Sequence, residues 1–183
     1  MSLLQAIILG IIQGATEFIP ISSSGHLVLV PWLLGWEPSG LLFDTVLHLG
    51  TLVAVVAYFW RDFWTVIKAW VRGQFRWDWS DPNARLGWLL ILGTIPAALA
   101  GALFEDFFES LFASPGWVSF FLLVTAALLA TSEYIGRRFR DLGDMRWIDA
   151  LFIGLAQAAA IAPGISRSGA TIAAGLSRGM ERS

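Results

Sequence analysis

The chain has 183 residues, of which 56% are hydrophobic and 14% are charged, and its net charge is −2. Soluble domains carry about 25% charged residues, so this composition and a mean hydropathy of +0.67 indicate a membrane protein. The chain contains no cysteine, which excludes disulfides, thiolate zinc sites and a cysteine nucleophile, and no basic stretch is long enough to indicate nucleic-acid binding.

The first hydrophobic segment, Leu3–Pro31, has no basic region before it, so we expect it to belong to the mature fold rather than to a cleaved signal peptide. Pro20 and the serines and glycine of Ser22–Gly25 interrupt it midway, and these residues disfavour a continuous helix. Non-helical backbone at membrane depth is tolerated only where it is buried in protein or lines a wet cavity. We therefore expect a re-entrant hairpin, in which a polar loop joins two helices.

Three further segments then meet the length of roughly 20 residues that a membrane-spanning helix needs. They are Leu41–Trp60, Leu86–Phe104 and Trp117–Ile135. Asp44 and His48 lie within the first span, and Pro96 predicts a kink in the second. A further interrupted segment, Trp147–Leu176, predicts a second hairpin with its own polar loop.

The loops between the spans differ in charge, and this predicts the orientation. Residues 61–85 carry five basic side chains, residues 136–146 carry four, and residues 105–116 carry three acidic and no basic ones. The positive-inside rule places the two basic loops in the cytoplasm and the acidic loop outside. The two hairpins then enter the membrane from opposite faces, as in an inverted-topology repeat whose polar loops meet near the midplane.

The two interrupted segments also resemble each other in sequence. A shift of 144 residues aligns Gly154 with Gly10, Gln157 with Gln13, Ser166 with Ser22, Ser168 with Ser24 and Gly169 with Gly25. We expect one all-α membrane domain over residues 1–183, a polytopic helix bundle with repeat 1 at about 1–140 and an incomplete repeat 2 at about 145–183. Because the counterpart of Leu41 would fall beyond Ser183, we expect the last three spans to be missing from this chain.

Polar groups at bilayer depth are costly and mark functional sites. Gln13 and Glu17 lie four residues apart on one helix face. A carboxylate there binds a divalent metal, acts as a base or supports a nucleophile; the alternative is a helix-end glutamate that reaches interfacial water.

The loop Ser22–His26 offers three hydroxyls, a glycine and an imidazole. Ser22, Ser23, Ser24 and Gly25 favour an anion-binding nest, and His26 is a candidate nucleophile, base or acid. The alternative is a serine that caps the following helix, a role compatible with phosphate binding at the same helix N-terminus.

The second loop, Pro163–Thr171, has an arginine at its centre. The planar fork of Arg167 suits phosphate, and Ser166, Ser168, Gly169 and Thr171 complete a phosphate cradle without a Walker lysine. The alternative is an arginine that reaches the cytoplasmic surface. Asp44 and His48 also share one helix face, where they either join the metal or substrate site or satisfy each other.

Together these motifs resemble the undecaprenyl-diphosphatase family, also called bacitracin resistance proteins. The resemblance rests on Gln13 with Glu17, on Pro20–His26, on Phe43–Asp44 with Leu47–Thr51, and on Pro163–Thr171. It covers the whole chain in order. It implies a multi-pass bacterial inner-membrane enzyme, with its site open to the outer face, that removes the terminal phosphate from a C55 isoprenyl diphosphate. The product is the lipid carrier of peptidoglycan synthesis, and the family implies a divalent cation, Mg²⁺ or Ca²⁺.

The resemblance also implies roles for single residues. Glu17 matches an acidic residue that is catalytic or metal-binding, and Gln13 occupies a position where the family accepts Glu or Gln and where it orients metal or water. Ser23 and His26 match the serine and histidine assigned to the reaction, with the nucleophile left open between them, and Arg167 matches the phosphate-binding arginine. Family members continue past the position of Ser183.

Two other functions stay open from the sequence. A transporter or flippase for a lipid phosphate has the same inverted repeats with broken helices, and a non-catalytic membrane fragment is the third alternative. The sequence also leaves a homodimer open.

Overall fold

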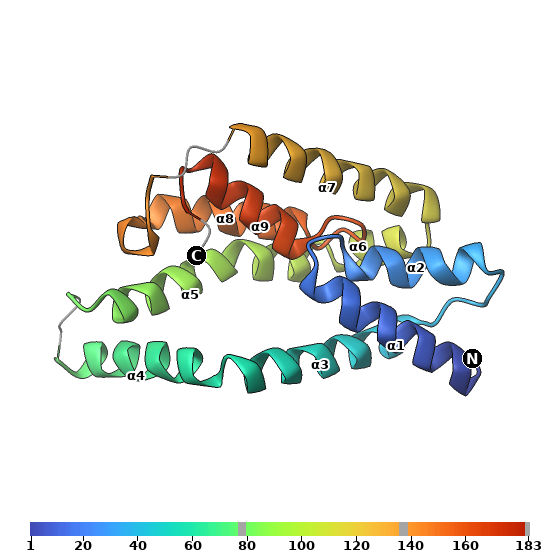
Figure 1. The fold of residues 1–183 in the computed structure, drawn as a ribbon, viewed down its shortest axis with the longest axis horizontal. Coiled ribbons are helices and arrows are strands. Elements are labelled where there is room, and N and C mark those ends of the chain that lie inside the picture. The colour runs from blue at the N-terminus through green and yellow to red at the C-terminus, as the bar shows by residue number, and fades with distance from the viewer. Residues whose placement is uncertain (77–79, 136–138, 182–183) are drawn as a thin grey trace.

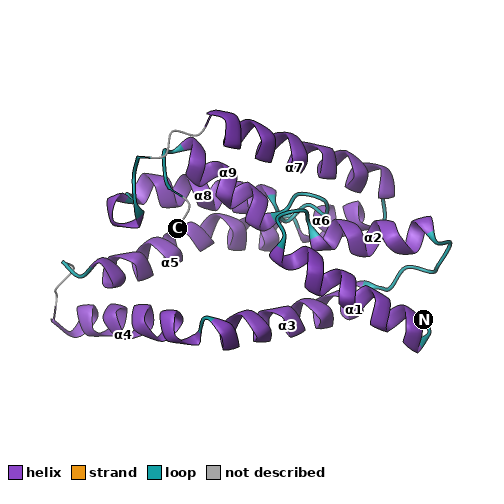
Figure 2. Ribbon diagram, viewed as in Figure 1, coloured by secondary structure: helices purple, strands orange, loops and turns teal. Residues whose placement is uncertain are grey.

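A computed structural model describes residues 1–76, 80–135 and 139–181, and over these residues the chain forms helices and loops with no β-strand (Figures 1 and 2). The first hairpin consists of α1 (Leu3–Phe18) and α2 (Ser23–Leu33). Five helices follow: α3 (Leu41–Tyr58), α4 (Trp60–Arg76), α5 (Pro82–Leu103), α6 (Glu105–Phe112) and α7 (Pro115–Ile135). After a 3₁₀ turn at Leu142–Asp144, the second hairpin consists of α8 (Trp147–Ala159) and α9 (Arg167–Ser177). The predicted all-α fold with two interrupted hairpins is confirmed.

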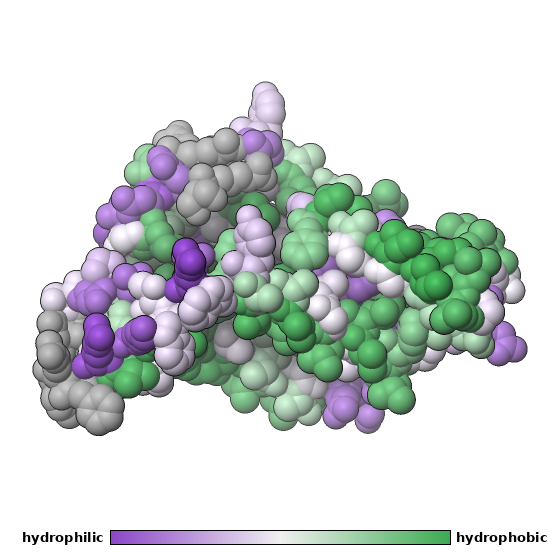
Figure 3. Space-filling view, turned by 60° about the horizontal axis from the view of Figure 1, so that its bottom comes forward, coloured by the Kyte–Doolittle hydropathy of each residue, from purple (hydrophilic) through white to green (hydrophobic). Residues whose placement is uncertain are grey.

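Among the described residues, three helices are long and apolar enough to cross a membrane, namely Leu41–Tyr58, Pro82–Leu103 and Pro115–Tyr134. They agree with the three predicted spans. Their side chains are mostly exposed, and apolar side chains cover much of the face shown in Figure 3. An apolar surface of this extent is typical of a protein that lipid covers, so the chain is a membrane protein.

The basic segment after α3 differs from the prediction, because α4 forms where a loop was expected. Apolar residues such as Phe63 and Ile67 recur along it at helical spacing between charged ones, which makes the helix amphipathic. It packs on α5, where Trp70 meets Trp88 edge to face at 5.7 Å and lies directly over Gly87. Such a helix is typical of the membrane interface. The predicted orientation stays a prediction, and Arg137 and Arg138, on which it partly rests, lie outside the described residues.

The two hairpins enter the molecule from opposite ends, and their tips meet at its centre (Figure 1). The backbone N–H of Gly164 donates to Ser22 Oγ at 3.2 Å, and a Cβ on Gly25 would lie 3.0 Å from Gly164 Cα. This arrangement agrees with the inverted hairpins expected from the sequence. The repeat boundaries near residues 140 and 145 stay a prediction.

Helix α7 holds the second tip in place through one threonine. Thr125 Oγ1 donates to the Gly164 carbonyl at 2.9 Å and accepts the Ser166 N–H at 3.0 Å, and all three residues are buried. Both backbone groups of the loop therefore have partners away from water, which a buried loop requires. The second tip is thus fixed to α7 and the first tip to the second.

Matching serines begin the second helix of each hairpin. Ser22 caps α2 by accepting the Gly25 N–H at 3.4 Å, and Ser166 caps α9 by accepting the Gly169 N–H at 3.1 Å. The capping role considered for the first serine loop is therefore confirmed. Residues aligned by the 144-residue shift perform the same structural task, which supports the internal repeat.

Candidate active site

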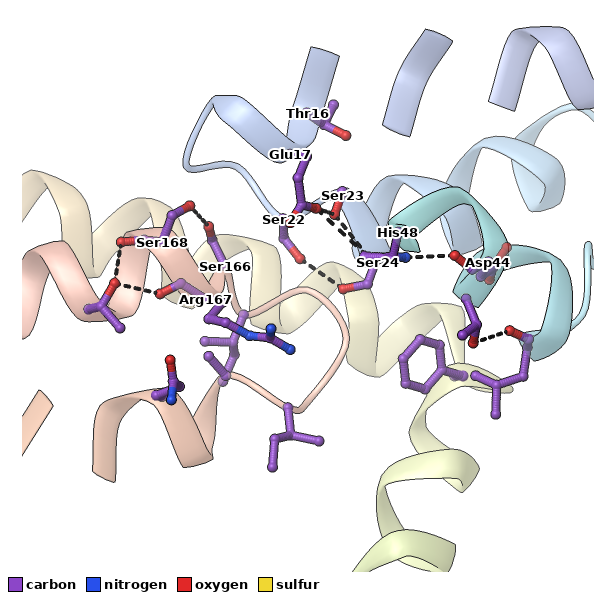
Figure 4. A pocket seen from close by; sticks show the side chains of 18 residues that line it. Thr16, Glu17, Ser22, Ser23, Ser24, Asp44, His48, Ser166, Arg167 and Ser168 are labelled. Atoms are coloured by element: carbon purple, nitrogen blue, oxygen red, sulfur yellow. Dashed lines mark hydrogen bonds and ion pairs between the residues drawn. The ribbon is translucent and has the colours of Figure 1, made fainter. Parts of the chain in front are cut away.

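A cavity of about 500 Å³ lies where the two hairpin tips and the start of α3 meet (Figure 4). Hydroxyl groups make up most of its polar lining, together with four ionisable side chains. The first hairpin contributes Thr16, Glu17, Ser22, Ser23 and Ser24; α3 contributes Asp44, Thr45 and His48; and the second hairpin contributes Gln157, Ser166, Arg167, Ser168 and Thr171. Most of the predicted site residues thus line one cavity, although they come from segments more than a hundred residues apart.

Glu17, Ser23 and His48 form a cluster on one wall of the cavity. Ser23 Oγ donates to Glu17 Oε2 at 2.5 Å, and His48 Nε2 lies 3.3 Å from Ser23 Oγ and 3.8 Å from Glu17 Oε2. A hydroxyl that donates to a carboxylate is the arrangement of an activated nucleophile. Ser23 itself is buried, at 6% exposure, so its orientation is set by these contacts.

Ser22, which directly precedes the clustered Ser23, has an unusual backbone conformation. Its φ is +67°, in the left-handed region that residues other than glycine rarely adopt. Its side chain accepts the N–H groups of both Gly25 and Gly164, so the two hairpins together fix this conformation. Strain of this kind costs on the order of 1–3 kcal/mol and gathers at functional sites.

Gln13 lies behind Glu17 and not in the lining of the cavity. It is buried, at 1% exposure, and its Nε2 donates to Glu17 Oε2 at 3.1 Å and to Thr51 Oγ1 at 3.4 Å. Among the described residues its Oε1 has no hydrogen-bond partner. The amide donor of Gln13 faces the carboxylate and helps to hold Glu17 in place, and the predicted part of Gln13 in a metal site stays a prediction.

Arg167 is the cation of the opposite wall. Its side chain extends into the space between the second hairpin and the Ser22–Ser24 loop (Figure 4). It is exposed, and within the described parts of the chain no carboxylate pairs with it. An unpaired guanidinium beside Ser166 and Ser168, whose hydroxyls lie 3.2 Å apart, is suited to a phosphate group.

The N-terminal ends of α2 and α9 both face this cavity, since Ser23 and Ser24 begin one helix and Arg167 and Ser168 begin the other. Each helix N-terminus carries a partial positive charge from its macrodipole. Arg167 and the two helix dipoles supply positive charge on one side of the cavity, and the carboxylates of Glu17 and Asp44 lie on the other. The side that carries Arg167 is the one suited to a polyanion.

The structure does not bring every predicted residue into the cavity. His26 is absent from the lining, and its Nδ1 lies 2.8 Å from the Ser22 carbonyl one turn earlier. Gly25 and Gly169 were expected to offer backbone amides to phosphate, but their N–H groups are already donated to the capping serines 22 and 166. Both glycines instead permit the close packing of the tips.

A divalent cation fits this site only in part. The described residues contain no group of three or more His, Cys, Asp and Glu side chains able to hold a metal ion. Mg²⁺ commonly takes one or two carboxylates and completes its shell with water and substrate phosphates. Glu17, which is about one-third exposed, is the residue placed to hold such an ion.

One charged cluster was not predicted from the sequence. Asp149, fully buried at the start of α8, accepts hydrogen bonds from Arg140 at 2.5 Å and Arg178 at 2.8 Å, and from the Arg146 N–H at 2.9 Å. It joins α8, the end of α9 and the segment before α8. A local sequence pattern does not predict this cluster, because one of the partners of Asp149, Arg178, lies 29 residues away in the chain.

Comparisons with known proteins identify relatives of this chain. The family described as bacitracin resistance protein BacA matches residues 6–183. The undecaprenyl-diphosphatases of Thermomicrobium roseum, Moorella thermoacetica and Rubrobacter xylanophilus are 47%, 48% and 50% identical to this chain. Each alignment covers the whole chain and 68% of the relative, so the chain spans about two thirds of the length of these proteins.

Proposed function

We propose that this chain, which belongs to the bacitracin resistance protein BacA family, is an integral-membrane phosphatase that hydrolyses undecaprenyl diphosphate to undecaprenyl phosphate and inorganic phosphate. The observation that carries the proposal is the single cavity in which Glu17 and Ser23 of one hairpin face Arg167 of the other. The reaction recycles the lipid carrier of cell-wall synthesis, and the family is described as bacitracin resistance proteins.

The cavity supplies the charge that a diphosphate requires. The chain as a whole is slightly negative, at −2, so binding a polyanion depends on local positive charge. Arg167 and the N-termini of α2 and α9 provide it, and the hydroxyls of both loops are placed to donate to non-bridging oxygens. Phosphoryl transfer depends mainly on such positioning and charge stabilisation.

Ser23 is the proposed nucleophile that attacks the terminal phosphorus. A bond forms between Ser23 Oγ and phosphorus, the bond from phosphorus to the bridging oxygen breaks, and the hydroxyl proton passes to Glu17 Oε2, which lies 2.5 Å away. Undecaprenyl phosphate leaves with the bridging oxygen. Water then hydrolyses the phosphoserine, which releases inorganic phosphate and restores the hydroxyl.

A divalent cation, Mg²⁺ or Ca²⁺, fits the proposal as a second source of positive charge. Bound by Glu17, it would neutralise charge on the phosphate oxygens. Gln13 contributes by holding the Glu17 carboxylate through its Nε2, as the 3.1 Å contact indicates.

The apolar surface explains why a phosphatase of this kind lies in a membrane. The three spanning helices pack beside the hairpins, α3 against α1, α5 against α8, and α7 against α2 and α9. They expose apolar side chains, among which an isoprenyl tail remains in an apolar environment. We place the protein in the bacterial inner membrane, with the cavity open to the outer face, as the distribution of loop charge favours.

The test is phosphate release from a C55 isoprenyl diphosphate by the purified chain, with and without Mg²⁺ or Ca²⁺. The Ser23→Ala variant is expected to lose activity by about 10³-fold or more, since it lacks the nucleophile. The control is Ser119→Ala on α7, because the exposed Ser119 hydroxyl bonds only within its own helix. Lipid movement without phosphate release would instead establish a transporter.

A further inference from the structure

His48 lies beside the proposed nucleophile, although His26 is the histidine that the serine loop carries. His48 lines the cavity from α3, and its Nε2 is 3.3 Å from Ser23 Oγ. Figure 4 shows the ring between Ser23 and Asp44. The sequence left two roles open for Asp44 and His48, participation in the site or a bond between their side chains, and the geometry decides between them.

The His48 ring is held by the backbone. Its Nδ1 lies 2.7 Å from the Asp44 carbonyl oxygen, which only accepts hydrogen bonds, so Nδ1 carries a proton. The Asp44 carboxylate is engaged elsewhere, since it accepts the Ser39 hydroxyl at 2.7 Å. The two side chains therefore do not satisfy each other, and Nε2 is left to face the cavity.

The backbone that carries His48 is also tied to the first hairpin. Thr51 Oγ1 donates to the His48 carbonyl at 2.9 Å and accepts from Gln13 Nε2 at 3.4 Å. Gln13 in turn donates to Glu17 at 3.1 Å. One chain of hydrogen bonds thus sets the position of α3 relative to Glu17 and, through it, the distance between the ring and Ser23.

His48 Nε2 lies 3.3 Å from Ser23 Oγ, which also bonds to Glu17. Because a hydroxyl has a single proton, a neutral ring competes with Glu17 Oε2 for it, whereas a ring with a proton on Nε2 donates to Ser23 Oγ and faces Glu17 Oε2 at 3.8 Å. Ser23 Oγ therefore lies between Glu17 on one side and His48 on the other. In both states the ring lies against Ser23 Oγ and limits the rotation of that side chain.

We propose that His48 is a catalytic residue of this site, which contacts Ser23 Oγ and holds it in the orientation for attack on the terminal phosphorus. The proposal rests on the proposed phosphatase function and assigns a task within it. His26 offers a direct comparison, because its Nδ1 faces the carbonyl of residue 22 at 2.8 Å in the same way, yet its ring does not line the cavity.

Two substitutions separate this role from a structural one. In His48→Asn the amide reaches only the position of Nδ1, so the bond to the Asp44 carbonyl persists and the contact with Ser23 is lost. In His48→Gln the amide reaches the position of Nε2, so the contact with Ser23 can persist. We expect kcat to fall by about 10²-fold in His48→Asn and by about 10-fold in His48→Gln, as misplacing a reacting group by about 1 Å costs on this scale.

The experiment measures kcat and KM for phosphate release from a C55 isoprenyl diphosphate, together with the thermal unfolding midpoint of each variant. KM is expected to change less than 3-fold, a rough bound, because Arg167 and the serine loops still bind the diphosphate. The matched control, His26→Asn, is expected to lower kcat less than His48→Asn does.

Three results would overturn the assignment of His48: a kcat in His48→Asn close to that of the unmodified chain, equal losses in His48→Asn and His48→Gln that follow a lowered unfolding midpoint, or a larger loss in His26→Asn. A different result, no phosphate release from the unmodified chain, would refute the phosphatase proposal itself, so the two failures are distinguishable.

Discussion

Replacement of Gly164 by alanine tests the contact between the hairpin tips at its tightest point. Gly164 has a φ of +100°, a conformation that residues with a side chain rarely adopt. An added Cβ would overlap the Val118 carbonyl oxygen and lie 2.9 Å from Phe121 Cβ. Neither neighbour yields easily, because one is helix backbone and the other is the first atom of its side chain.

The cost of Gly164→Ala follows from these two effects. The left-handed conformation costs a residue with a Cβ about 1–2 kcal/mol, and forcing extra volume into a packed site costs about 1–3 kcal/mol. We therefore expect a loss of about 2–5 kcal/mol in the free energy of unfolding, which lowers the unfolding midpoint of a chain of this size by at least about 4 °C. Phosphate release should fall as well, because the same loop positions Arg167.

The assay is thermal unfolding in detergent, followed in parallel with phosphate release. Gly116→Ala is the matched control. Gly116 lies at the start of α7, the helix that carries Val118 and Phe121, and an added Cβ there would meet no atom within 4 Å. We expect that control to keep the original midpoint or to exceed it slightly, since alanine favours helix. Equal midpoints for Gly164→Ala and Gly116→Ala would show that the tips do not pack as described.

Two further substitutions test the charged groups. Glu17→Gln is expected to lower phosphate release by about 10²-fold or more and to flatten its dependence on Mg²⁺ or Ca²⁺, because the carboxylate acts as both base and cation ligand in the proposal; an unchanged metal titration would remove Glu17 from the second role. Asp149→Asn is expected to lower the free energy of unfolding by about 3 kcal/mol, because it leaves the guanidinium groups of Arg140 and Arg178 without their buried partner. The exposed Asp62→Asn on α4 serves as its control, and equal midpoints for these two variants would contradict a structural role of Asp149.

Much of the fold could be predicted from local signals. Pro20 and the serine–glycine loops marked the hairpin turns, and the lengths of the apolar runs marked the three spans that the structure contains. The charge of the loops indicated that the hairpins oppose each other, as they do in Figure 1. These signals act within a few residues, so the sequence carries them directly.

The features of the site and fold that the sequence did not predict depend on contacts between distant segments. Both His26 and His48 bond to the backbone one turn earlier, and only the packing of α3 against α1 decides which ring meets Ser23. The buried Asp149 likewise finds its partners through the folding of the second hairpin. The basic residues of α4 are typical of a charged loop, whereas its helix depends on aromatic residues such as Trp70, which packs on Trp88 of α5.

The central claim is that two opposed hairpins bring Glu17 and Arg167 to one diphosphate, and a double-mutant cycle tests it most directly. Phosphate release is measured for Glu17→Gln, Arg167→Ala and the double variant, with Arg72→Ala on the exposed face of α4 as a charge control. We expect Arg167→Ala alone to lose about 10³-fold, and the double variant to lose clearly less than the product of the single losses, with a coupling of about 0.5–3 kcal/mol. Losses that multiply without coupling would contradict a shared site.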